Sequence, residues 1–174
     1  YRDSATASKI FTPLAEARVN VMTHAFMYGT ACFEGVRAYW NAEQGQLYLL
    51  KAAEHYRRLQ ASARVMLMDL PQPVDQLVAL TVELLRRNGF RQDAYVRPSV
   101  YKSSQVIGVR LHDLEHRFMI VTVPFGDYID TSRGISAMTS SWRHTSDVSI
   151  PARSKITGAY ANSAFAKSDA NLNG

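Results

Sequence analysis

The feature that most constrains the fold is a pair of amphipathic helical patterns set among short apolar runs. The first pattern, over residues 52–66, repeats its apolar residues at helical spacing. These residues are Tyr56, Leu59, Ala63 and Met66. The second pattern begins at Val74, and the pair Asn88-Gly89 is typical of the C-terminal end of a helix. The sequence therefore predicts two helices that each bury one face.

The strand-like runs lie in an irregular order around these helices. They cover residues 17–22, 36–40, 47–50, 94–101, 118–123 and 135–142. Residues 41–46 are typical of a hairpin loop, residues 24–35 suggest a short helix and a tight turn, and residues 157–173 suggest a final helix. Mixed elements joined by hairpin-length links predict an α+β fold rather than a doubly wound parallel sheet.

The composition excludes several other classes of protein. Hydrophobic residues make up 47% of the 174 residues and charged residues 20%, which excludes disordered and collagen-like chains. The single cysteine, Cys32, excludes an internal disulfide framework and is predicted to be a small core residue. No apolar run is long enough to span a bilayer, and the N-terminus has no apolar signal core. Because the chain opens on Tyr1, we expect that it does not begin at its natural first residue.

The net charge of +5 raises the question of a polyanionic partner. The only tight basic pairs are Arg57-Arg58 and Arg86-Arg87, and both lie within helical patterns. Scattered basic residues favour solvated faces over a nucleic-acid surface. A basic, non-enzymatic binding module remains an alternative hypothesis.

One lysine is the strongest candidate for chemistry, since no metal-binding, P-loop or dinucleotide motif is present. Lys155 follows the lead-in Ile150-Pro151 and precedes the helix predicted from Thr157. A partly desolvated lysine has a lowered pKa and can form a Schiff base with an aldehyde cofactor. An exposed loop lysine is far commoner, and periodicity leaves both interpretations open.

Five blocks of sequence resemble the branched-chain amino acid aminotransferases, a family of fold-type IV, pyridoxal-phosphate-dependent enzymes. In order they are HAFMYGTACFEGVRAYW (24–40), EHYRRL (54–59), AYVRP (94–98), PFGDY (124–128), and SSW (140–142) followed by KITGAYAN (155–162). The similarity runs from about residue 13 to residue 174. Five blocks in the same order make the resemblance specific.

The resemblance implies a division of the chain into parts. Residues 1–127 would form a complete small N-terminal α+β domain, and residues 128–133 an interdomain linker. Residues 134–174 would begin a larger, cofactor-binding C-terminal domain, the rest of which we expect to lie outside this chain. A fragment that assembles with a partner but does no chemistry is therefore a further hypothesis.

The resemblance also implies a cofactor, pyridoxal 5′-phosphate, and three residues that bind it. Lys155 would hold the cofactor as a Schiff base and then move a proton between the substrate Cα and the cofactor C4′. Arg58 would contact the cofactor phosphate, with Arg57 as the alternative if the register slips by one. Tyr160 would lie near the phenolic oxygen of the cofactor.

The implied reaction moves an amino group between leucine, isoleucine or valine and 2-oxoglutarate, in a cytoplasmic homodimer or higher homo-oligomer. Arg97 and tyrosine hydroxyls would accept the charged side chain of glutamate. The implied substrate-binding residues are Tyr28, Phe33, Arg37, Tyr95, Arg97, Val109, Phe125 and Tyr128, of which Tyr28 and Val109 would reach the pocket of the partner subunit. D-amino acid aminotransferase, R-selective amine transaminase and aminodeoxychorismate lyase share the fold and are the nearest alternatives.

Overall fold

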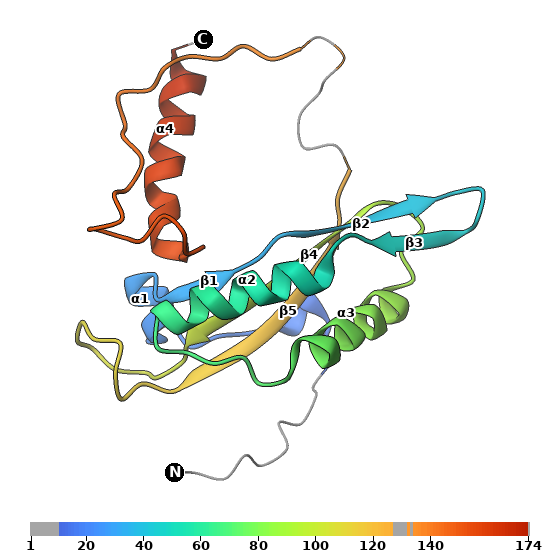
Figure 1. The fold of residues 1–174 in the computed structure, drawn as a ribbon, viewed down its shortest axis with the longest axis horizontal. Coiled ribbons are helices and arrows are strands. Elements are labelled where there is room, and N and C mark those ends of the chain that lie inside the picture. The colour runs from blue at the N-terminus through green and yellow to red at the C-terminus, as the bar shows by residue number, and fades with distance from the viewer. Residues whose placement is uncertain (1–10, 127–131, 133, 174) are drawn as a thin grey trace.

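The computed structural model describes residues 11–126, 132 and 134–173, and its body is an antiparallel sheet (Figure 1). The strands are β1 (Ala31–Phe33), β2 (Val36–Asn41), β3 (Gln46–Leu49), β4 (Ala94–Lys102) and β5 (His116–Pro124). β1 and β2 lie end to end along one edge of β4, and β5 pairs with the other edge over the full length of β4. β2 and β3 form the predicted hairpin. The α+β class is confirmed.

The helices were predicted more closely than the strands. They are α1 (His24–Tyr28), α2 (Ala52–Val65), α3 (Val74–Asn88) and α4 (Tyr160–Leu172), with short 3₁₀ turns η1 (Leu14–Glu16) and η2 (Thr157–Ala159). α2 and α3 lie together across one face of the sheet (Figure 1). The four apolar residues predicted for the inner face of α2 are all buried. Gly89 ends α3 in the left-handed conformation, as expected.

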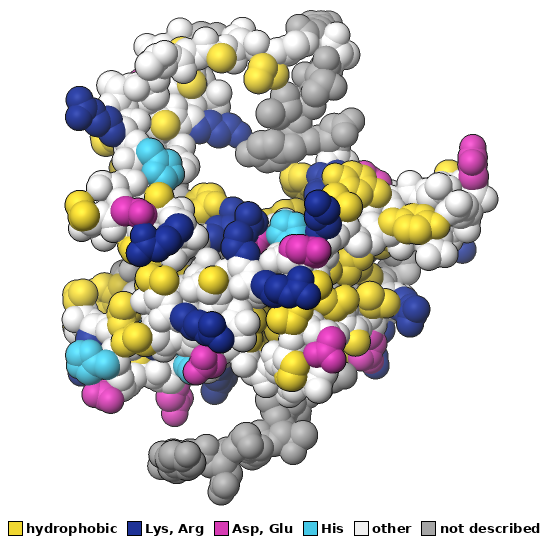
Figure 2. All heavy atoms as spheres, viewed as in Figure 1, with side chains coloured by type: hydrophobic (Ala, Val, Ile, Leu, Met, Phe, Trp, Pro, Cys, Tyr) yellow, Lys and Arg dark blue, Asp and Glu magenta, His cyan; other side chains and the backbone are white. Residues whose placement is uncertain are grey.

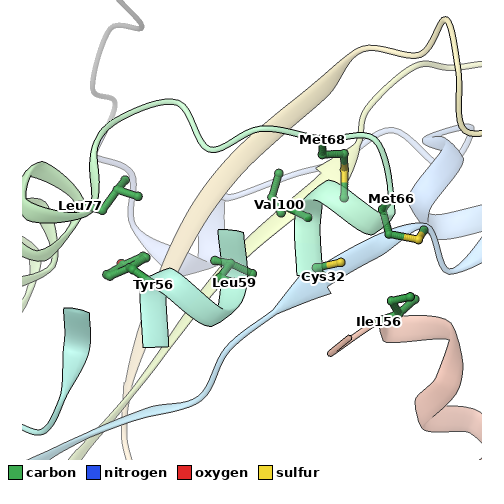
Figure 3. Close-up of a cluster of buried hydrophobic side chains, with 9 residues drawn as sticks. Cys32, Tyr56, Leu59, Met66, Met68, Leu77, Val100 and Ile156 are labelled. Atoms are coloured by element: carbon green, nitrogen blue, oxygen red, sulfur yellow. The ribbon is translucent and has the colours of Figure 1, made fainter. Parts of the chain in front are cut away.

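The core lies between the sheet and these two helices. Figure 3 shows Cys32 of β1 and Val100 of β4 close to Leu59 of α2, in the cluster to which Tyr56 also belongs. Ile156, from the C-terminal part of the chain, belongs to the same cluster. Cys32 has no exposed surface, and burial raises the pKa of its thiol to about 12. The prediction that this cysteine is a core residue is confirmed.

The two faces of the sheet differ in composition because side chains alternate along a strand. On β4, Ala94, Val96 and Val100 point into the core beneath the helices. The intervening residues Tyr95 and Arg97 lie on the opposite face. A sheet with one face covered by helices leaves the second face free to carry polar and aromatic side chains.

Two predicted strands are wrong. Residues 17–20 have no regular structure and residues 21–22 form a turn, in which the Met22 N–H donates to Asn20 Oδ1 at 2.8 Å and so satisfies a backbone group locally. Residues 135–142 contain no strand, and Ile135 and Met138 are exposed. An alternating apolar pattern forms a strand only where a neighbour accepts its backbone hydrogen bonds, and no described segment pairs with this one.

The C-terminal part of the described chain reaches back to the sheet after a long excursion. Residues 134–154 run without helix or strand, and η2 and α4 follow them (Figure 1). The linker predicted at residues 128–133 falls mostly outside the described residues, so the domain boundaries stay a prediction. No helix in the described ranges is long and apolar enough to cross a membrane.

Candidate active site

The segment that carries Lys155 is docked on β1 by backbone contacts. Cys32 and Ile156 form an antiparallel bridge, and the Phe33 N–H donates to the Lys155 carbonyl at 3.2 Å. On its other side, the Lys155 N–H donates to the hydroxyl of Ser62, a buried residue of α2, at 3.1 Å. A strand edge and a helix therefore fix the backbone on which the lysine stands.

Two glycines allow this close approach. Gly29 ends α1 with φ +66°, and a Cβ there would lie 2.7 Å from the Cα of Gly158. The Gly158 N–H donates to the Gly29 carbonyl at 3.2 Å, and the Thr157 hydroxyl donates to the Ala31 carbonyl at 2.6 Å. The backbone contact at Gly29 leaves no room for any side chain.

Lys155, Tyr160 and Arg58 line one cavity of about 220 Å³. Lys155 Nζ donates to the Tyr160 hydroxyl at 2.5 Å. Arg58 comes from α2, whereas the other two come from the C-terminal segment, so the cavity joins parts far apart in sequence. The remaining lining residues are His144, Thr145, Ala152, Arg153, Ser154, Ala159 and Ser163.

A fully buried carboxylate holds Arg58. Glu34 Oε1 accepts from Arg58 Nε at 2.5 Å, and Oε2 accepts from Nη2 at 2.7 Å. His55 Nδ1 lies 2.9 Å from the same Oε2. Burial raises the pKa of Glu34, but the hydrogen bonds from Arg58 and His55 outweigh it and leave that pKa below its ordinary value. The hydrogen bond to Glu34 in turn raises the pKa of Arg58.

Aromatic rings and arginines extend from the lysine across the open face of the sheet. Lys155 Nζ lies 4.9 Å from the centre of the Phe33 ring, and the Tyr160 ring lies 4.8 Å from that ring, centre to centre. The Arg97 guanidinium also lies over the Phe33 ring, 4.8 Å from its centre. Phe33 is thus a wall shared by the lysine and an arginine.

The same surface continues from Arg97 to the end of β5. Arg97 Nε donates to the Tyr95 hydroxyl at 3.2 Å, and the rings of Tyr95 and Phe125 lie 5.5 Å apart. Arg37 lies over the Phe125 ring at 5.2 Å and pairs with Asp93 at 3.3 Å. Among the described residues Arg97 has no ion pair, so it is the arginine of this surface whose charge is open to a ligand.

The structure thus brings together most of the predicted site residues. Those in the cavity or on the adjoining surface are Lys155, Tyr160, Arg58, Phe33, Arg97, Tyr95, Phe125 and Arg37. Tyr28 lies apart from them, where its hydroxyl accepts the Gly108 N–H at 3.1 Å, and Val109 nearby is 87% exposed. Their predicted role in a partner subunit stays a prediction. Tyr128 lies outside the described residues.

Sequence reasoning assigned no role to several residues on which this arrangement depends. Glu34 and His55 lay within resembling blocks, but their pairing with Arg58 is a contact between distant segments. At Gly35, a Cβ would lie 2.7 Å from the Tyr95 hydroxyl, so this glycine leaves room for the tyrosine. The pair Glu34-Gly35 can be seen in the sequence. The contacts that these two residues make, with Arg58 and with Tyr95, can be seen only in the structure.

Comparison with known proteins identifies the family to which this chain belongs. The sequence model described as "Amino-transferase class IV" matches residues 31–174. The chain belongs to the class IV aminotransferases. It is 48% identical over 162 residues to a probable branched-chain-amino-acid aminotransferase of Aquifex aeolicus, a match that covers 93% of this chain and 52% of that protein.

Solved structures of such aminotransferases share the fold. One, from Thermoproteus uzoniensis with norvaline, superposes with a TM-score of 0.86 at 37% identity, over 92% of this chain and 53% of the other. Another, from Thermobaculum terrenum in its PLP-form, gives a TM-score of 0.84 at 31% identity, over 94% and 53%. The chain therefore has the fold-type IV architecture and spans about half the length of the relatives it matches.

The donor set in the cavity suits pyridoxal phosphate, the cofactor of fold-type IV aminotransferases. It provides a primary amine for the aldehyde, a phenol within hydrogen-bonding distance of that amine, and a guanidinium for the phosphate. The groups come from Lys155, Tyr160 and Arg58, the three residues that the resemblance implied.

The contact at Gly29 predicts a specific cost for a methyl group. Gly29→Ala adds both a left-handed conformation and a collision with the Lys155 segment, whereas Gly89→Ala adds only the first, since nothing lies within 4 Å of a Cβ there. We expect Gly89→Ala to lower stability by about 1–2 kcal/mol. Gly29→Ala should lower it further and weaken the binding of pyridoxal phosphate.

Denaturant unfolding and cofactor titration of both variants in the intact protein check this expectation. Equal losses of stability, together with unchanged cofactor affinity in Gly29→Ala, would contradict the docking argument. A loss of affinity in Gly89→Ala as well would do the same, because that glycine is remote from the cavity.

Proposed function

We propose that this protein is a pyridoxal-phosphate-dependent aminotransferase that exchanges the amino group between branched-chain L-amino acids and 2-oxoglutarate. The observation that carries the proposal is the convergence of Lys155, Tyr160 and Arg58 on one cavity. The names of the similar proteins support the branched-chain assignment, since those proteins are called branched-chain-amino-acid aminotransferases.

The residues of the cavity divide the work of such a reaction. When bound, pyridoxal phosphate supplies an electron sink that stabilises negative charge at the substrate Cα. Lys155 is the general base that takes the proton from this Cα and returns it during transfer. The Tyr160 hydroxyl, 2.5 Å from Nζ, orients the amine by a hydrogen bond, and Arg58 binds the phosphate.

The face of the sheet opposite the helices offers contacts for both apolar and negatively charged substrate side chains. Phe33 and Phe125 offer apolar walls for leucine, isoleucine and valine. Arg97 lies between Phe33 and the Tyr95 hydroxyl and carries an open positive charge. The carboxylate of glutamate or 2-oxoglutarate fits this arginine, while Arg37 is already paired with Asp93.

The remaining expectations concern the surroundings of the enzyme. We propose a homodimer or higher homo-oligomer, in which Tyr28 and Val109 reach the pocket of a second copy and Tyr128 lines the pocket of its own. We also propose a cytoplasmic enzyme of branched-chain amino acid biosynthesis. A basic binding module is less well supported, because acidic side chains interrupt the basic ones on the face in Figure 2.

A covalent adduct tests the cofactor assignment. We expect that borohydride reduction of the intact protein with pyridoxal phosphate attaches the cofactor to Lys155, as mapped by peptide mass. Lys155→Ala should abolish the adduct, whereas Lys167→Ala, at an exposed lysine of α4, should keep it. An adduct at another lysine, or none in the wild type, would refute the proposed function.

Substrate choice separates this enzyme from its fold-type IV relatives. We expect the half-reaction with L-leucine to be at least about tenfold faster than that with D-alanine or an R-amine, a difference of roughly 1.4 kcal/mol in transition-state free energy. Single-turnover kinetics of the loaded enzyme measure the three rates. A faster reaction with D-alanine or the R-amine would reassign the enzyme to one of those relatives.

The open charge of Arg97 predicts a selective defect. Arg97→Gln should lower kcat/KM for glutamate by about 10–100-fold, because a hydrogen bond to a charged group is worth roughly 1.5–3 kcal/mol. The value for leucine should change little, since its side chain carries no charge. Arg91→Gln, at an exposed arginine beyond α3, is the matched control and should alter neither value. Equal losses for both substrates would assign Arg97 a structural role.

A further inference from the structure

We propose that Glu34 is a positioning residue that holds the guanidinium of Arg58 in the orientation in which it meets the cofactor phosphate. The inference rests on the proposed function and concerns the same cavity. It assigns a task to the only buried acid that contacts a cavity-lining residue among the described side chains.

The two hydrogen bonds define the plane of the guanidinium. Nε and Nη2 of Arg58 each donate to a different oxygen of Glu34, at 2.5 and 2.7 Å. Such a bidentate pair restricts both the final side-chain torsion and the tilt of the planar group. Nη1 takes no part in these bonds. A free arginine side chain would sample many rotamers, and this pairing removes that freedom before a ligand arrives.

Glu34 can act in this way because it is itself fixed. It lies in the two-residue break between β1 and β2, and its N–H donates to the Pro98 carbonyl of β4 at 2.9 Å. Its carboxylate then reaches α2, where His55 and Arg58 stand three residues apart on one side of the helix. The position of Arg58 is thereby fixed relative to the sheet, on which the Lys155 segment also docks.

The exposure of the two side chains is unequal in a way that suits an anionic ligand. The carboxylate of Glu34 has no exposed surface, while the side chain of Arg58 is 56% exposed and lines the cavity. The positive group faces the cavity in which the anionic ligand would bind, and the negative group lies behind the positive one. Hydrogen bonds from Arg58 and His55 keep the buried carboxylate ionised, so the pairing persists at neutral pH.

A purely structural clamp between the β1–β2 break and α2 is the competing explanation. A clamp would support the whole cavity and would therefore affect every ligand alike. A positioning residue for Arg58 affects only the part of the affinity that the phosphate contributes. Pyridoxal, which lacks the phosphate, separates these two explanations.

The test compares the dissociation constants of pyridoxal phosphate and pyridoxal for the intact apoprotein, by absorbance titration. We expect Glu34→Gln to weaken pyridoxal phosphate by about tenfold or more, as loss of a residue that orients a ligand-binding group does in metal sites. The affinity for pyridoxal should stay within about twofold. Glu54→Gln, at an exposed acid in the first turn of α2, is the matched control and should change neither constant.

Arg58→Gln identifies the route of the effect. If Glu34 acts through the arginine, Glu34→Gln adds no further loss of pyridoxal phosphate affinity in the Arg58→Gln background. Should Glu34→Gln fail to fold, Glu34→Asp keeps the charge but withdraws it by one methylene. The same loss, selective for the phosphate, is then expected.

Three results would overturn the inference: equal weakening of both ligands, no weakening of either, or additive losses in the double variant. Failure of the proposed function has a different signature, which is the absence of the Lys155 adduct in the wild type. A wild type that forms the adduct, with a Glu34→Gln variant that binds both ligands normally, would refute the inference alone.

Discussion

The position of Lys155, the lysine of the cavity, depends on one backbone contact, the antiparallel bridge between Cys32 and Ile156. In extended segments successive side chains point to opposite sides. Because Cys32 and Ile156 both enter the core, their neighbours Phe33 and Lys155 lie together on the opposite side, with Lys155 Nζ over the buried Phe33 ring. The burial of Ile156 thus stabilises the fold and also sets the direction of the Lys155 side chain. The pair Gly29 and Gly158, at one end of the bridge, allows the two backbone segments to approach each other.

How much of this fold the sequence could predict depends on the length of each pattern. α2 was predicted to within a residue because its apolar side chains repeat over several turns. β1 was missed, and its residues were predicted as part of a helix and turn, because three residues are too few to show the alternation of a strand. Residues 135–142 show the converse error, because their apolar alternation has no pairing partner in the described chain.

Residues of the site could be predicted where the chemistry requires a particular residue type. They could not be predicted where their role depends on a contact between distant segments. Lys155, Arg58 and Tyr160 came from a resemblance to a family, and the structure brings all three to one cavity. Nothing in the sequence paired Glu34 with Arg58 or Gly29 with Gly158. Such pairs join segments whose neighbourhood is decided only when the sheet and α2 assemble.

The arginines of the site differ by what lies behind them. Arg58 is backed by the buried Glu34, and Arg37 by the half-buried Asp93, so each has a fixed direction and a partly balanced charge. Arg97 has no acid partner within the described ranges, and its contacts are the rings of Phe33 and Tyr95. Such an arginine can pair with an anionic side chain or lie flat against the rings when the ligand is apolar. This difference gives one surface the means to accept both an anionic and an apolar side chain.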